Sequence, residues 1–202
     1  MTQPKTYMDP RLVELLAKIA RAQKDPVLKD AAWAIGGAMG MMAHGVRRFT
    51  NDIDIFVEPE RRHDMIRALR TTGLTVSPVF APHHYVAMLP KHNDPEIRID
   101  VLAPASDPEE SAAQMAVKRP IDKWSFPVFT PEFLVLAKFY SDQPGALGDI
   151  ALMLDAGIVD QGEAVRLLLM MSKRDAGVLK LLFKRLAEPR VARPRPKRRS
   201  GR

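Results

Sequence analysis

The stretch 51–57, with the sequence NDIDIFV, is the most informative segment of the chain for its fold. Asp52 and Asp54 alternate with Ile53 and Ile55, a period of two that is typical of a strand with one buried face. In such a strand both carboxylates leave the same face, with Cα atoms roughly 6.5–7 Å apart. This spacing lets two acids share divalent cations, because two-metal phosphoryl-transfer sites hold their ions about 3.5–4 Å apart. The stretch therefore predicts a strand that carries a pair of metal ligands.

A second alternating run carries a third acid. In residues 97–101, IRIDV, Asp100 faces away from the two isoleucines. Hydroxyl-to-phosphate chemistry uses a third carboxylate as a metal ligand or as a general base. Asp100 is therefore the residue that we expect to complete a trio with Asp52 and Asp54.

The residues upstream of the acid pair suit phosphate groups. Gly36-Gly37 lies between an apolar run at 32–35 and a predicted short helix at 38–43, and Arg48 and Thr50 directly precede the acids. Backbone N–H groups at a glycine turn can approach a phosphate closely. Taken singly, an Asp-x-Asp is equally consistent with a solvated strand end, and a glycine pair with an ordinary turn. Their combination favours phosphate chemistry.

Hydrophobic periodicity predicts an α+β protein, mixed to about residue 104 and mainly helical after it. We expect helices at 10–24, 60–71, 109–117, 131–140, 146–156, 161–171 and 175–187, and extended segments at 74–80, 85–89, 97–102 and 126–129. The turn signal Asn93-Asp94-Pro95 predicts that 85–89 and 97–102 form a hairpin. The expected organisation is a core at 1–104, a helical C-terminal part at 105–188 and a disordered basic tail at 189–202.

Composition excludes several classes of protein. The chain has 202 residues, 46% of them hydrophobic, which suits one compact unit or a domain with a small helical appendage. The absence of cysteine excludes disulfides and thiolate catalysis and fits a reducing compartment. A bilayer-spanning helix needs about 20 apolar residues, and the longest nearly uncharged stretch, 31–43, is shorter and interrupted by glycines. We therefore expect a cytoplasmic protein without a membrane partner.

The formal net charge of +7 resides in the C-terminal tail. Residues 190–202 contain seven arginines and lysines and no acid, so residues 1–189 hold 24 charges of each sign. Proline-spaced polycations bind phosphate backbones without sequence specificity, although such tails can also be merely solubilising. RNA is thus a candidate partner through the tail.

The quoted residues resemble the signature of a known superfamily. Ala34-Ile35-Gly36-Gly37-Ala38, His44-Gly45, Arg48, Thr50 and Asp52-Ile53-Asp54-Ile55 are similar to the DNA polymerase β-type nucleotidyltransferases, and within them to bacterial nucleotidyltransferase-like proteins of the abortive-infection toxin type. Asp100 in IRIDVL matches the later acid of that pattern, and Lys138 and Asp149 match a lysine and an aspartate of the helical half. The resemblance spans about residues 30–155.

The resemblance implies a minimal mixed β-sheet flanked by helices, followed by a small helical C-terminal part. It also implies transfer of a nucleoside monophosphate from an NTP such as ATP, with Mg²⁺ or Mn²⁺, to a hydroxyl of RNA, a protein or a small molecule. In that chemistry Asp52, Asp54 and Asp100 are the catalytic metal ligands, and Asp100 activates the acceptor hydroxyl. The nucleotide-binding residues are then Gly36, Gly37, Arg48, Thr50 and Lys138. Family analogy adds a toxin role with an antitoxin protein as partner.

A non-catalytic nucleotidyltransferase-like module that binds nucleotide or nucleic acid is the alternative. It is supported by Gly37, at a position where many active relatives have serine, and by residues 143–146 (QPGA), where many relatives carry a basic residue and an aspartate. The intact trio of acids favours an enzyme instead. Asp149 is equally well explained as a packing acid, and Lys138 as a lysine on a core helix. His44, His83 and His84 match no zinc signature, and we assign them no ligand role. The acceptor and the base of the nucleotide are left open.

Overall fold

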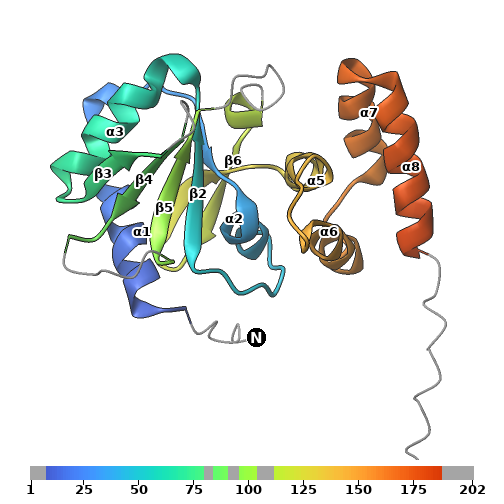
Figure 1. Ribbon diagram of the computed structural model, residues 1–202, viewed down its shortest axis with the longest axis horizontal. Coiled ribbons are helices and arrows are strands. Elements are labelled where there is room, and N and C mark those ends of the chain that lie inside the picture. Colours follow the sequence, from blue (N-terminus) through green and yellow to red (C-terminus); the bar gives the residue numbers. More distant parts are fainter. Residues whose placement is uncertain (1–7, 80–83, 91–95, 104–111, 188–202) are drawn as a thin grey trace, which may run out of the picture.

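The protein is built on one seven-stranded mixed sheet with helices on both faces, seen in the computed structural model in Figure 1. The structure describes residues 8–79, 84–90, 96–103 and 112–187. The strands are β1 (Trp33–Ile35), β2 (Asp52–Val57), β3 (Thr75–Pro78), β4 (His84–Met88), β5 (Arg98–Leu102), β6 (Val117–Ile121) and β7 (Trp124–Val128). Their order across the sheet is β3-β4-β5-β2-β1-β7-β6. The predicted α+β fold, a mixed sheet flanked by helices and followed by a helical part, is confirmed.

The helices divide between the two faces of the sheet. They are α1 (Pro10–Ala22), α2 (Gly37–Ala43), α3 (Arg62–Thr71), α5 (Pro131–Phe139), α6 (Ala146–Asp155), α7 (Gln161–Met171) and α8 (Lys173–Ala187), with short 3₁₀ turns η1 (Pro26–Leu28) and η2 (Pro59–Arg61). Figure 1 shows α1 and α3 on one face, α2 on the other, and α5 to α8 stacked beyond α2. Proline at N1 and a side-chain cap start both α1, through Asp9, and α5, through Thr130.

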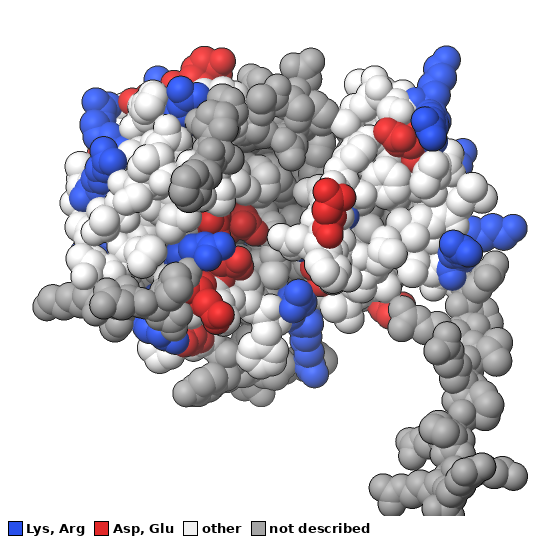
Figure 2. Space-filling view, in the orientation of Figure 1, with Lys and Arg blue, Asp and Glu red and all other residues white. Residues whose placement is uncertain are grey.

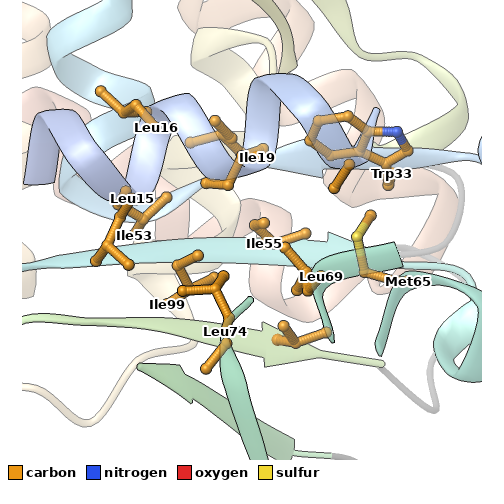
Figure 3. Close-up of a cluster of buried hydrophobic side chains, with 14 of the residues drawn as sticks. Leu15, Leu16, Ile19, Trp33, Ile53, Ile55, Met65, Leu69, Leu74 and Ile99 are labelled. Atoms are coloured by element: carbon orange, nitrogen blue, oxygen red, sulfur yellow. The ribbon is translucent and has the colours of Figure 1, made fainter. Parts of the chain in front are cut away.

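The main core lies between the sheet and the pair α1 and α3. Ile53 and Ile55 of β2 and Ile99 of β5 are fully buried there, and Figure 3 shows them beside Leu15 and Ile19 of α1. Each such side chain contributes about 1.5–3 kcal/mol when fully buried. A one-residue slip of β2 would send its isoleucines to the opposite face. The core therefore holds the alternating acids of β2 on the other face of the sheet.

A second core joins that other face to the C-terminal helices. Phe56 of β2 stacks against Phe129, with ring centroids 4.7 Å apart, and Phe129 contacts Phe133 of α5. Buried residues of α6, α7 and α8 continue the cluster. The helical part is thus packed next to the acidic face of the sheet.

The segment after residue 104 adds two strands, β6, which the sequence did not predict, and β7, which it predicted only in part. We expected a helix at 109–117 and a single extended piece at 126–129, but the helix at 112–114 ends before Val117, where β6 begins. Residues 109–111 lie outside the described part of the chain. β6 is an edge strand with Lys118, Arg119 and Pro120 exposed, and edge strands tolerate charge and proline, which erases the alternation. The division into 1–104 and 105–188 stays a prediction, although the sheet itself continues past residue 104.

Several other expectations concern connections and termini. β4 and β5 pair antiparallel, as the hairpin prediction required. Its turn at 93–95, His83 and the basic tail 190–202 lie outside the described residues. Within the described ranges, no helix has both the length and the apolar character needed to cross a bilayer.

Candidate metal and nucleotide site

Three carboxylates converge where β2 and β5 run side by side. The two strands are parallel, and their register places Asp54 opposite Asp100 and Asp52 opposite Arg98. One carboxylate oxygen from each of Asp52, Asp54 and Asp100 lies within 4.8 Å of the others. Neighbouring strands are about 4.8 Å apart and side chains two residues apart share a face, so the pairing alone brings the trio together. Figure 2 shows acidic side chains gathered with basic ones over the region of β2 and β5.

The negative charges of the three carboxylates favour the binding of a cation between them. The pKa of Asp54 is raised from 3.8 to about 6, first by burial and then by the negative charges of Asp52 and Asp100, while Lys138 and Arg98 oppose the shift. Carboxylate oxygens are the ligands that Mg²⁺ and Mn²⁺ prefer. Three converging carboxylates that repel one another are therefore a donor set that fits such an ion.

Asp100 is held from both sides by residues that sequence reasoning did not assign to the site. His84 Nε2 donates to Asp100 Oδ1 over 2.7 Å, and Arg98 Nε donates to Asp100 Oδ2 over 2.8 Å. Asp100 itself is only 4% exposed. Hydrogen bonds of this kind orient the carboxylates of metal sites. The available signal for Arg98 was its spacing of two from Asp100, whereas His84 reaches the site only through the pairing of β4 with β5.

The glycine turn lies directly against Asp54. The backbone N–H of Gly36 donates to the main-chain oxygen of Asp54 over 3.0 Å. Gly37 has φ +55°, and a Cβ added there would lie 1.8 Å from Asp54 Oδ2. A serine at position 37 would therefore displace the present Asp54 side chain. The close contact with Asp54 is thus a local steric reason for glycine at position 37.

The other predicted nucleotide-binding residues divide between two clusters. Thr50 Oγ1 donates to Asp52 Oδ1, within the acidic trio. Arg48 Nε and Lys138 Nζ instead meet at Asp149, over 2.7 Å to Oδ1 and 2.9 Å to Oδ2. Asp149 is 3% exposed, so α6 supplies a buried anchor for both cations. The charge of Lys138 still reaches Asp54, whose pKa it lowers.

Comparison with known proteins identifies the fold. No family model and no curated protein matches the chain. Among solved structures, the crystal structure of ANT(2'')-Ia in complex with adenylyl-2''-tobramycin aligns with a TM-score of 0.54 and 17% identity, over 89% of this chain and 100% of that one.

Two further structures align at similar scores. The solution structure of the antibiotic-resistance factor ANT(2'')-Ia gives a TM-score of 0.52 and 20% identity, over 88% of this chain and 94% of that one. An antigenic nucleotidyltransferase-like protein from Paracoccidioides brasiliensis gives 0.51 and 15%, over 86% and 94%. At these identities the likeness shows that the chain has the nucleotidyltransferase fold.

Proposed function

We propose that this chain is a metal-dependent nucleotidyltransferase that moves a nucleoside monophosphate from an NTP to a hydroxyl acceptor. The observation that carries the proposal is the trio Asp52, Asp54 and Asp100, whose oxygens lie within 4.8 Å of one another beside the Gly36-Gly37 turn. The fold supports it, because a structure with this fold contains the adenylylated product adenylyl-2''-tobramycin.

The three aspartates would hold Mg²⁺ or Mn²⁺. When bound, the ion would offset the negative charge of the phosphoryl group that is being transferred. Asp100 takes the proton of the acceptor hydroxyl, whose oxygen forms a bond to the α-phosphorus. The bond from that phosphorus to the bridging oxygen breaks, and pyrophosphate leaves with the electron pair. His84 and Arg98 keep Asp100 oriented for this role, and the remaining lone pairs of its oxygens stay available.

The nucleotide would lie along the glycine turn and the cations next to it. Gly36 and Gly37 would contact the phosphate chain through backbone N–H groups of their turn, because the space that their side chains would need is filled by Phe56 and Asp54. Lys138 and Arg48, both anchored on Asp149, supply positive charge for the phosphates. Thr50 orients Asp52. The protein's contribution is placement and charge neutralisation rather than covalent chemistry.

The acceptor carries a hydroxyl, and three classes compete for the role: a small polyhydroxylated molecule, RNA and a protein. RNA would be recruited by the basic tail 190–202 through salt-dependent phosphate contacts. The toxin role and an antitoxin partner derive from the sequence resemblance alone. Growth arrest on expression, relieved by Asp54→Asn, would support that role.

The decisive experiment incubates the protein with each α-labelled NTP, Mg²⁺ or Mn²⁺ and separate pools of total RNA, extract protein and aminoglycosides. The matched control is the double variant Asp52→Ala/Asp54→Ala. Transfer of label that is lost in the control supports the enzyme, and the labelled pool identifies the acceptor class. A chain ending at residue 189 should lose transfer to RNA only.

Absence of transfer with all four nucleotides and both metals would contradict the enzymatic proposal. Retained binding of nucleotide in that case would favour the non-catalytic module.

A further inference from the structure

We propose that Arg98 is a built-in cation of the acidic trio that offsets one carboxylate charge and so weakens the intrinsic affinity of the site for divalent cations. This inference rests on the proposed function and deepens it. A site that is partly neutralised by its own arginine takes up its ions most readily when the phosphates of a nucleotide add negative charge. Arg98 would thus tie metal loading to nucleotide binding.

The position of Arg98 follows from strand register. Arg98 lies opposite Asp52 across the parallel pair β2–β5, just as Asp100 lies opposite Asp54. The period of two places Arg98 on the same face as Asp100, and its Nε donates to Asp100 Oδ2 over 2.8 Å. One cation and three carboxylates therefore form a two-by-two arrangement on adjacent strands.

The charge of Arg98 acts on the whole trio. The oxygens of the trio lie within 4.8 Å of one another, so a guanidinium bonded to Asp100 is close to all three carboxylates. A guanidinium does not lose its proton in a protein. It cannot give way to an incoming ion by deprotonation, so the ion and the guanidinium repel each other.

Arg98 could also act by orienting Asp100, and this role predicts that replacing Arg98 has the opposite effect on ion binding. If orientation dominated, loss of Arg98 would let Asp100 turn away and would weaken ion binding. However, His84 holds the other oxygen of Asp100 at 2.7 Å. Asp100 therefore keeps one anchor when Arg98 is replaced. We expect the repulsion to dominate.

The size of the repulsion can be bounded. Arg98 is 36% exposed at its side chain, so a water-like dielectric is appropriate. In a dielectric like that of water, a unit charge changes the affinity for a divalent ion roughly tenfold if the two lie about 6 Å apart. Replacing Arg98 by a neutral residue should tighten binding of Mn²⁺ by about that factor.

The test is a titration of the nucleotide-free protein with Mn²⁺, followed by calorimetry or by the electron paramagnetic resonance of the free ion. Arg98→Met removes the charge, and Arg98→Lys keeps it while changing the hydrogen bond. Arg67→Met, on the exposed side of α3 and 63% exposed at its side chain, is the control for a lost surface arginine. We expect binding roughly tenfold tighter in Arg98→Met, and binding close to wild type in the other two.

Equal or weaker binding in Arg98→Met would overturn the inference. If that occurs while the wild type binds Mn²⁺ and transfers nucleotide, the proposed function survives. No binding of Mn²⁺ by any of the proteins, either alone or in the presence of a non-hydrolysable NTP analogue, would overturn both. Circular dichroism checks folding, and Arg98→Gln, which can still donate to Asp100, replaces the methionine variant if that one does not fold.

Discussion

Alanine at position 37 should disable the site through a single steric contact. Gly37 has φ +55°, and an added Cβ would lie 1.8 Å from Asp54 Oδ2 and 2.9 Å from its Cγ. Contacts below 3.0 Å do not occur for real Cβ atoms, so the Asp54 carboxylate has to move. Because Asp54 is the central member of the trio, its movement changes the geometry of metal binding directly.

The effect has two parts that can be separated. A left-handed backbone costs a residue with a side chain about 1–2 kcal/mol, and this part lowers the free energy of unfolding. The displacement of Asp54 lowers the affinity for Mn²⁺, and disturbed support of a ligand typically costs about 10–100-fold. We therefore expect Gly37→Ala to lose modest stability and most of its metal affinity and transfer activity.

Gly157 provides a matched control. It has φ +65°, similar to Gly37, but an added Cβ meets nothing within 4 Å. Gly157→Ala therefore carries the backbone cost without the contact. Urea unfolding should show a loss in both variants, at least as large in Gly37→Ala, whose Cβ also displaces Asp54, while Mn²⁺ titration should show a loss only in Gly37→Ala. Equal affinity for Mn²⁺ in the two variants would refute the steric argument.

Three further predictions concern charge. Since the pKa of Asp54 rises from 3.8 to about 6 on folding, the native protein holds a proton that the unfolded chain releases. The free energy of unfolding of the metal-free protein should thus fall by up to about 3 kcal/mol as the pH rises from 4 to above 6. Measured by urea unfolding, this free energy should depend less on pH in Asp54→Asn than in the wild type. Asp149→Asn leaves two cations without their buried carboxylate and should cost about 3 kcal/mol by the same assay, whereas Asp155→Asn, at an exposed position of the same helix, should cost little. Lys138→Met should weaken binding of a fluorescent NTP analogue roughly tenfold or more; unchanged binding would remove Lys138 from the phosphate site.

Local patterns were sufficient for much of the fold and of the candidate site. The alternation in NDIDIFV sets acids and isoleucines on opposite faces of β2, and the same period in β5 does so for Asp100. Caps such as Thr130 before Pro131 mark helix starts. These features depend on neighbours a few residues apart, so they can be recognised without knowledge of the fold. β6 was missed because an edge strand carries no such alternation.

Tertiary structure alone decided which of these faces meet. The pairing of Asp54 with Asp100 and of Asp52 with Arg98 is a matter of register between strands far apart in the sequence. Arg48 meets Asp149 across 101 residues, and the buried carboxylate of Asp149 needs both of its cations. Periodicity states only that a side chain lies on a polar or an apolar face. Its partner there is selected by the packing of the whole core, in which burying the isoleucines and pairing the buried charges are satisfied by one arrangement of strands and helices.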